Sequence, residues 1–367
     1  MRIALVTGHY IPRLGYMEVH LSKAFALLGH DVHVFTTNRF PAYLKHERGD
    51  FGDPPKGVQV SRLHPFFSLG QIVRARGLRE KVKAYHPDLI VVVGLGKWFP
   101  KPVFSSKTPI YTLLGDNAYS YANASWKSKL LFNLFKRSTY EKALKVSDRL
   151  FTYTPETREV VLSMMGDSFR ESLNQSTEIS LGYWCSEFFF DQKIRNQWRA
   201  RLGYGQNDKV VITATRVVPE KKLEDQIEFF KSAEKNVKWL ILGASNSPYC
   251  KELEKKLAKD LGQDRFMLLP YASRSELNNY YNAADLALFT VPAISIFEAL
   301  GAGLKLRIPK VKTLERVSDE SFRSCLTNEP FDLRDFEYSR DETMQRSKSE
   351  FAWENLAAGM LAENVSH

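Results

Sequence analysis

The stretch AADLALFTVPAISIFEALGAGLKL (283–306) contains two short apolar runs with a helical pattern between them. The first run covers 285–290 and the second begins at 304, and both have the length and composition of strands in a parallel sheet. Between them, Ser295 and Glu298 have the spacing of a capping box at the start of a helix. We therefore predict strand, helix and strand in succession, which is the repeating unit of a parallel α/β sheet.

The same alternation extends over most of the 367 residues. The first series predicts strands at 2–7, 31–37, 88–94, 110–115, 149–154 and 178–182, with helices near 17–28, 71–84 and 126–146. The second predicts strands at 209–216, 237–244, 265–271, 285–290 and 304–309, with helices near 223–233, 250–261 and 275–283 and around Glu298. Because this length exceeds what one core supports, we predict two doubly wound, Rossmann-like α/β domains that face each other across a cleft.

A polar stretch, DQKIRNQWRARLGYGQNDK (191–209), separates the two series, and we predict that it is the linker. After the charged residues 311–348, the sequence FAWENLAAGMLAENV returns to a helical pattern. We therefore predict a first domain of residues 1–190 plus 350–367, which includes this returning helix, and a second domain of residues 191–349. In open α/β sheets ligands bind at the carboxyl ends of the strands, so site residues are expected directly after strands.

The composition indicates a soluble protein with an anionic partner. Lysine and arginine number 52 against 42 acidic residues, and this net charge of +10 favours nucleic acid, phosphorylated metabolites or an acidic membrane face. Since the basic residues form no recognised motif, we expect no nucleic acid partner. Cys185, Cys250 and Cys325 suit a reducing cytosol, and no apolar run approaches the roughly 20 residues of a membrane span. The expected location is the cytoplasm, including the inner face of a membrane.

Two cations follow the first strand of the second series. In TATRVVPEKK (213–222), Arg216 ends the strand and Lys221 precedes the next helix. Together with the amide groups at the start of a helix, such a pair of cations is suited to bind a diphosphate. The alternative is a solvated basic turn, because clusters of charge are common in loops.

Glu298 has two interpretations of equal weight. In the first, it completes a capping box with Ser295 and stabilises its own helix by about 1 kcal/mol. In the second, its carboxylate accepts hydrogen bonds from the two hydroxyls of a ribose. The small residues Gly301, Ala302 and Gly303 favour the second, because a helix packed closely beneath a ligand requires small side chains.

The first strand leads into a loop and helix, GHYIPRLGYMEVHLSKAFALLGHDV (8–32). Gly15 is suited to let backbone amides approach an anionic ligand, although most such glycines serve only to adopt positive φ. His9 and His20 are candidates to face the ligand, although a lone histidine more often packs or caps. HExxH, CxxC and DxD patterns are absent from the sequence, so we expect neither a metal nor another cofactor.

A basic amphipathic segment, ASWKSKLLFNLFKRSTYEKALK (124–145), has a tryptophan and several lysines around an apolar stripe. Such a helix is able to lie on an anionic leaflet. In the alternative, its apolar face covers the first sheet and its lysines are in water.

These motifs together resemble the glycosyltransferases of the GT-B fold, similar to glycosyltransferase family 4, over nearly the whole chain. The start of the chain is similar to the family's Gly-containing loop and following GH-D/E-V strand, ISLGYWCSEFFFD to its interdomain segment, and ATRVVPEKK to its GR...eKG element. The stretch quoted at the outset resembles the nucleotide-sugar signature, and FAWENLA the helix that returns to the first domain.

The resemblance implies a role for each candidate residue. Arg216 and Lys221 would bind the donor diphosphate and stabilise its departure, while Glu298 would bind the ribose. The donor site would also include Gly15 and the amides of Ile294, Ser295 and Ile296. The acceptor side would include His9, Tyr16 and Asp116.

The implied activity is retaining transfer of a hexose from a nucleotide diphosphate sugar to a glycan or lipid-linked acceptor, in cell-surface polysaccharide or glycoconjugate synthesis. The chain departs from the family at Thr290, where a second glutamate is common, at Cys185, where an acid is usual, and at Lys305, where proline is usual. These departures leave open a non-catalytic scaffold of the same fold that binds a nucleotide sugar or glycan.

Overall fold

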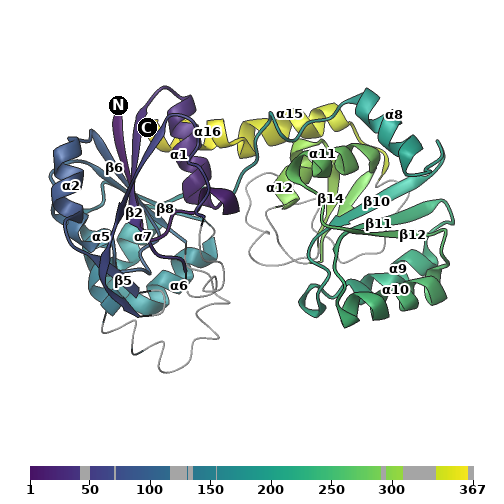
Figure 1. The fold of residues 1–367 in the computed structure, drawn as a ribbon, viewed down its shortest axis with the longest axis horizontal. Helices are drawn as coiled ribbons and strands as arrows, with labels where there is room; N and C mark the ends of the chain where they lie inside the picture. The colour runs from purple at the N-terminus through teal and green to yellow at the C-terminus, as the bar shows by residue number, and fades with distance from the viewer. Residues whose placement is uncertain are drawn as a thin grey trace. The chain divides into compact units, whose positions relative to one another are not determined.

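The computed structural model describes residues 1–41, 50–69, 72–115, 130, 135–153, 155–290, 295–308 and 336–362. The chain forms two compact units: unit 1 comprises Met1–Ser180 with Leu356–His367, and unit 2 comprises Leu181–Asn355. Figure 1 shows a sheet flanked by helices in each unit. The predicted pair of Rossmann-like α/β domains is therefore confirmed.

The boundaries of the units differ from the predicted ones, because residues 181–190 and 350–355 belong to unit 2. The amide of Tyr183 donates to the carbonyl of Phe351 at 3.0 Å, and the amide of Trp353 donates to the carbonyl of Tyr183 at 3.1 Å. Residues 181–190 and residues 350–355 thus bind each other as well as the core of unit 2.

In unit 1 the described strands of the main sheet pair in parallel, in the order β3-β2-β1-β6-β7-β8-β9. The strands are β1 (Arg2–Thr7), β2 (Asp31–Thr37), β3 (Val58–Leu63), β6 (Leu89–Val93), β7 (Ile110–Leu114), β8 (Arg149–Thr152) and β9 (Thr177–Glu178). The helices include α1 (Met17–Leu27), α2 (Leu78–Tyr85), α5 (Arg137–Val146), α6 (Pro155–Met165) and α7 (Arg170–Asn174), with 3₁₀ turns at Pro12–Leu14, Lys101–Ser105 and Asp167–Phe169.

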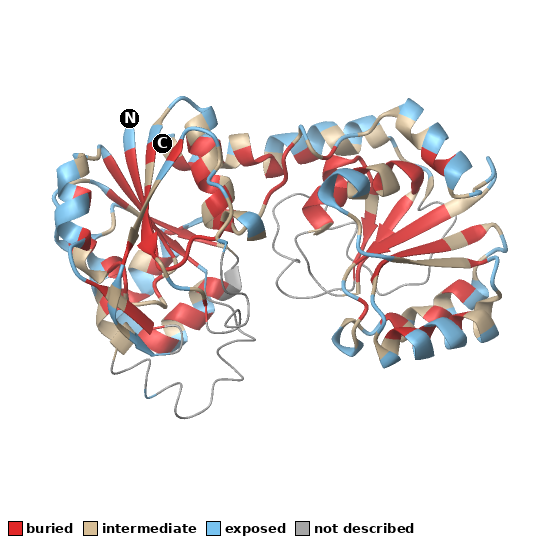
Figure 2. Cartoon of the chain, viewed as in Figure 1, coloured by how far each residue is buried: buried red, intermediate tan, exposed pale blue. Residues whose placement is uncertain are grey.

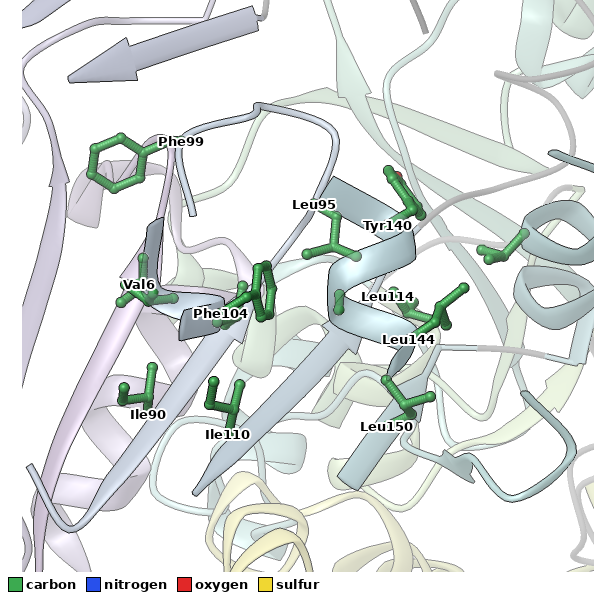
Figure 3. Packing of buried hydrophobic residues seen from close by; sticks show 14 of the residues in the cluster. Val6, Ile90, Leu95, Phe99, Phe104, Ile110, Leu114, Tyr140, Leu144 and Leu150 are labelled. Atoms are coloured by element: carbon green, nitrogen blue, oxygen red, sulfur yellow. The ribbon is translucent and has the colours of Figure 1, made fainter. Parts of the chain in front are cut away.

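The central strands of unit 1 are buried on both faces, which explains their uninterrupted apolar sequences. Figure 2 shows these strands in red, and all five residues of β6 are buried. Ile90 of β6 and Ile110 of β7 are register partners, and Figure 3 shows them side by side in a cluster that also contains Phe104. The sheet therefore forms a rigid base whose strand ends carry the loops.

The sequence predicts one helix near 71–84, and this prediction is wrong for its first half. Residues Ile72–Ala75 form β5, which pairs antiparallel with β4 (Pro65–Leu69). The β-branched residues Ile72 and Val73 favour a strand. Gly77, with φ 78°, then precedes the start of α2.

In unit 2 the described strands pair in parallel, in the order β12-β11-β10-β13-β14. They are β10 (Lys209–Ala214), β11 (Val237–Ala244), β12 (Phe266–Pro270), β13 (Leu286–Leu288) and β14 (Lys305–Arg307). The helices include α8 (Gln192–Arg201), α9 (Ile227–Ser232), α10 (Pro248–Leu261), α11 (Arg274–Ala283), α12 (Ser295–Gly301) and α15 (Arg340–Phe351), with 3₁₀ turns at Pro219–Lys221 and Leu223–Gln226. The last helix, α16 (Trp353–Leu361), begins in unit 2 and continues into unit 1. Figure 1 shows α9 and α10 on one face of this sheet and α11 and α12 on the other.

The predicted linker at 191–209 is instead part of unit 2, because its first half is the helix α8. The Asp191 side chain caps this helix by accepting from the amides of Lys193 and Ile194. Arg195 and Arg199 then form ion pairs with Asp285, which also accepts a hydrogen bond from the amide of Val210 at 2.8 Å. These arginines, whose polarity suggested a solvated linker, therefore attach α8 to Asp285, the residue directly before β13.

Replacing Asp285 with alanine is expected to destabilise unit 2 by about 3–5 kcal/mol, because it leaves two poorly exposed guanidinium groups without their carboxylate. A shift of the urea unfolding midpoint measures this effect. Asp167→Ala is the matched control, since the pair of Asp167 with Arg170 is exposed and such pairs contribute about 0–1 kcal/mol. Equal shifts in the two variants would contradict the structural role of Asp285.

Candidate functional site

The order of strands in unit 2 reverses beside β10. The chain passes from β10 to β11 and β12 on one side, then returns to β13 on the other side of β10. Ligands of doubly wound sheets bind at such a reversal, outside the carboxyl ends of the two central strands. The loop after β10 carries Arg216 and Lys221, and the chain after β13 leads to α12.

The structure brings Arg216 and Lys221 together in the loop after β10. Arg216 is exposed and Lys221 is half-buried at the end of a 3₁₀ turn. Burial lowers the pKa of the Lys221 ammonium, and the nearby Arg216 cation lowers this pKa further. Two like charges near each other attract an anion, so this loop is a candidate anion site.

Gly243 allows the loop to leave β10 in this position. It has φ 107°, and a Cβ atom added to it would be 2.0 Å from the carbonyl oxygen of Thr215. Its own carbonyl accepts a hydrogen bond from the amide of Val217 at 3.1 Å. A side chain at this position would therefore displace the residues on both sides of Arg216.

Two hydrogen bonds join the segments that follow β10 and β13. The hydroxyl of Thr290 donates to the carbonyl of Lys221 at 2.5 Å, and the hydroxyl of Ser295 donates to the carbonyl of Ala214 at 3.2 Å. The two sides of the strand reversal are thus fixed to each other. Thr290, which stands where the resembled family commonly has a glutamate, has a structural role in this contact.

The predicted capping box at the start of α12 is not formed. The helix begins at Ser295, whose hydroxyl binds the end of β10 rather than an amide of α12. Ile296 is 1% exposed and packs in the hydrophobic core of unit 2. Ile294, which we also predict to contact the donor, lies outside the described residues.

Glu298 is 6% exposed and binds Arg274 instead of capping its helix. The distance from Arg274 Nη2 to Glu298 Oε1 is 3.1 Å, and Arg274 Nε lies 2.9 Å from Glu187 Oε2. Burial raises the pKa of the Glu298 carboxyl, Arg274 opposes this shift, and the charge of Glu187 adds to it. Arg274 thus holds the Glu298 carboxylate in a fixed position.

The small residues after Glu298 have a different cause from the predicted one. A Cβ atom added to Gly301 would lie 2.4 Å from the ring of Tyr183, and one added to Gly303, with φ 74°, would lie 2.8 Å from the carbonyl oxygen of Arg340. Ala302 is 0% exposed. Packing within unit 2 therefore explains this run, and it does not support a ligand beneath the helix.

Arg274 was not among the predicted site residues. It follows Ser273, the N-cap of α11, which forms a genuine capping box with Glu276. The ASRSE pattern after β12 identifies this helix start in the sequence. The pattern does not reveal that Arg274 reaches Glu298, because that contact joins two helices.

The predicted residues of unit 1 lie around the end of β1. His9 is buried, and its Nδ1 lies 2.9 Å from the carbonyl oxygen of Arg39. Gly15 has φ 57°, but its amide donates to the carbonyl of Pro12 at 3.1 Å, so this amide is not available to a ligand. Tyr16 is the N-cap residue of α1, without a side-chain cap, and Asp116 lies outside the described residues.

The described part of the predicted membrane-binding segment consists mainly of α5, and Leu130 before it is 49% exposed. Most of residues 124–134 lie outside the described part of the chain. In α5, the buried residues Thr139, Tyr140, Ala143 and Leu144 face the core of unit 1. Within the described residues, no helix is long and apolar enough to span a membrane, and no cluster of three or more potential metal ligands is present.

Residues 194–305 match the family model of the glycosyl transferases group 1. We refer to these matched residues as the group 1 domain. This domain includes Arg216, Lys221, Arg274 and Glu298, so the candidate site of unit 2 lies wholly within the match. No curated protein sequence matches the chain significantly.

Solved structures resemble the whole chain, beyond the group 1 domain. HepE from Anabaena in complex with UDP is 16% identical, with 98% of each chain covered and a TM-score of 0.68. Sucrose-phosphate synthase from Thermosynechococcus elongatus is 18% identical over 98% of this chain and 97% of that one, with a TM-score of 0.62. WaaG, a glycosyltransferase involved in lipopolysaccharide biosynthesis, is 15% identical over 99% and 96%, with a TM-score of 0.56. The predicted resemblance to glycosyltransferases of the GT-B fold is thus confirmed.

Gly243→Ala is expected to destabilise unit 2 by about 1–3 kcal/mol, because alanine strains at positive φ and its Cβ meets the Thr215 carbonyl. The unfolding midpoint in urea measures the change. Gly359→Ala, in the interior of α16 with nothing within 4 Å, is the control and should be neutral or stabilising. A neutral Gly243→Ala protein would contradict the proposed support of the Arg216 loop.

Proposed function

We propose that the chain transfers a hexose from a nucleotide diphosphate sugar to a glycan or lipid-linked acceptor, with retention of anomeric configuration. The observation that carries this proposal is the paired cations Arg216 and Lys221 at the strand reversal of the group 1 domain. A diphosphate is negatively charged and is therefore bound by the two cations. Its negative charge grows when the sugar departs. HepE has been solved with UDP and with UDP-glucose, so UDP is the first nucleotide to test.

Each residue of the site has a role in this proposal. Arg216 and Lys221 bind the diphosphate and stabilise the leaving group, which lowers the barrier because the interaction is stronger in the transition state. Glu298 accepts hydrogen bonds from the ribose hydroxyls, and Arg274 keeps its carboxylate oriented and ionised. The backbone at the start of α12 contributes amide groups near the anion.

Thr290 is the observation that favours a second candidate function, that of a non-catalytic scaffold. Its hydroxyl binds the backbone of Lys221, so it does not supply the carboxylate that the resembled family commonly has. A non-catalytic scaffold would therefore bind a nucleotide sugar and release it unchanged. Incubation with UDP-sugars and GDP-sugars, with product detected by mass spectrometry, distinguishes transfer or hydrolysis from binding alone.

Arg216→Ala is expected to lower kcat/KM by on the order of 100-fold or more, because it removes a donor that meets the developing charge. Steady-state assays with the active sugar nucleotide measure the loss. Lys235→Ala removes an exposed lysine before β11, at the opposite end of the strands, and should retain the wild-type rate. Unchanged turnover in Arg216→Ala would show that the catalytic assignment is wrong.

Glu298→Gln is expected to weaken UDP binding about 10- to 100-fold, since a hydrogen bond to a charged group contributes about 1.5–3 kcal/mol. Because the pKa of Glu298 is raised, wild-type affinity should also fall as the pH drops through that pKa, when the carboxylate becomes protonated. Calorimetric titration of UDP against pH measures both effects.

In Glu298→Gln, the pH dependence of UDP affinity should still include the ionisation of UDP itself. It should lack the contribution of the Glu298 carboxylate. Glu254→Gln, on the exposed side of α10, controls for the loss of one negative charge. If Glu298→Gln kept the affinity and the pH profile of the wild type, the ribose contact would be refuted.

A further inference from the structure

A residue outside the group 1 domain reaches the candidate site of unit 2. Glu187 lies in residues 181–190, which we call the connecting segment because they directly follow the last residue of the main part of unit 1. The match to the glycosyl transferases group 1 begins only at residue 194. Glu187 nevertheless pairs with Arg274, and Arg274 pairs with Glu298. The group 1 domain alone therefore does not contain every residue that acts on Glu298.

Arg274 stands at a position where a cation is unfavourable. It is the first residue of α11, and the amino end of a helix carries a partial positive charge. The capping box of Ser273 and Glu276 already satisfies the start of this helix. The helix thus gains nothing from an arginine at its first position. We infer that Arg274 serves its two carboxylate partners rather than its own helix.

The two carboxylates use different nitrogens of Arg274. Nε donates a hydrogen bond to Glu187 Oε2 at 2.9 Å, whereas Nη2 lies 3.1 Å from Glu298 Oε1. Because a guanidinium is a rigid planar fork, fixing Nε also fixes the direction of Nη2. The Arg274 side chain is 47% exposed, so burial alone does not hold it in this direction. The hydrogen bond to Glu187 therefore determines where the guanidinium points.

The backbone around Glu187 is anchored to α11. The amide of Phe189 donates to Asn278 Oδ1 at 3.1 Å, and the amide of Asp191 donates to Asn282 Oδ1 at 2.7 Å. Asn282 Nδ2 in turn donates to the carbonyl of Phe189 at 2.8 Å. Both asparagines belong to α11 and are buried. The connecting segment and α11 thus have one fixed arrangement, across which the ion pair forms.

Glu187 acts on Glu298 through its hydrogen bond and through its charge. Burial raises the pKa of the Glu298 carboxyl, and the Arg274 cation, which Glu187 directs, lowers it. The negative charge of Glu187 itself raises this pKa. Tyr281 of α11, whose own pKa burial raises, is a neutral neighbour of Glu298. The helix α15 also packs against α12, through the uncharged Ser347.

We propose that Glu187 is a positioning residue, which holds the Arg274 guanidinium so that the Glu298 carboxylate keeps one orientation for the ribose. Ion pairs as exposed as that of Glu187 with Arg274 contribute little to stability, so the effect of this pair is one of direction. Without it, Arg274 changes rotamer freely, and a bound nucleotide has to order both side chains at a cost in affinity. The ribose contact rests on the proposed function, whereas the fixation of Glu298 by Glu187 does not.

Nuclear magnetic resonance of the protein without a ligand tests this fixation. With ¹⁵N-arginine, Arg274→Lys identifies the Arg274 Nε–H signal, which should exchange slowly with water in the wild type and rapidly in Glu187→Ala. Glu187→Gln keeps an acceptor oxygen and should retain slow exchange. With ¹³C-glutamate, Glu298→Gln identifies the Glu298 carboxyl. Its pKa should be lower in Glu187→Gln than in the wild type, because a negative charge has been removed.

Calorimetric titration with UDP tests the consequence for the ribose contact. At a pH above the pKa of Glu298, Glu187→Ala should weaken UDP binding about five-fold or more, and Glu187→Gln should recover part of this loss. The urea unfolding midpoint of Glu187→Ala should stay close to that of the wild type, which excludes general damage to unit 2. Glu254→Ala, on the exposed side of α10 and the opposite face of the sheet, is the control and should bind UDP as the wild type does.

Three results would overturn the role of Glu187. They are an Arg274 Nε–H exchange rate unchanged by Glu187→Ala, a Glu298 pKa unchanged by Glu187→Gln, and wild-type UDP affinity in Glu187→Ala while Glu298→Gln binds more weakly. If Glu298→Gln itself keeps the affinity of the wild type, the ribose contact of the proposed function fails. The two resonance signals then still decide whether Glu187 positions Arg274 and Glu298.

Discussion

The hydrogen bonds from Thr290 to the Lys221 carbonyl and from Ser295 to the Ala214 carbonyl constrain the rest of the site in unit 2. The strands β10 and β13 are buried on both faces, so their carboxyl ends are the places where polar side chains are able to gather. These two bonds join the loop after β10 to the start of α12. As a result, the backbone that carries Arg216 and Lys221 is joined to α12, and an anion is the partner that relieves the repulsion between these two cations.

The sequence was sufficient for the parts of the fold that depend on local pattern. The strands β1, β2, β10 and β11 were predicted close to their observed bounds, because buried parallel strands have continuous apolar sequences. The loop that carries Arg216 and Lys221 was found for the same reason, since it follows such a strand. The hairpin at Ile72–Ala75 was missed because its basic residues matched a helical pattern equally well.

The remaining features depend on contacts between distant segments, and local sequence does not encode them. Residues 191–209 have the polarity of a linker, yet Arg195 and Arg199 bind Asp285, which is far away in the sequence. The glycine at 301 suggested a ligand, although the ring of Tyr183 occupies the space. Glu298 was selected as a site candidate from its position after β13, but its partner Arg274 lies on another helix. In each case the missing information was which elements pack together.

Hydrogen–deuterium exchange with and without UDP tests the central claim most directly, because it reports where the ligand orders the backbone. The account predicts that UDP slows exchange in unit 2 mainly within residues 215–222, after β10, and within residues 295–301, at the start of α12. Protection confined to the opposite edge of the sheet, or to segments remote from the β10 and β13 ends, would contradict it.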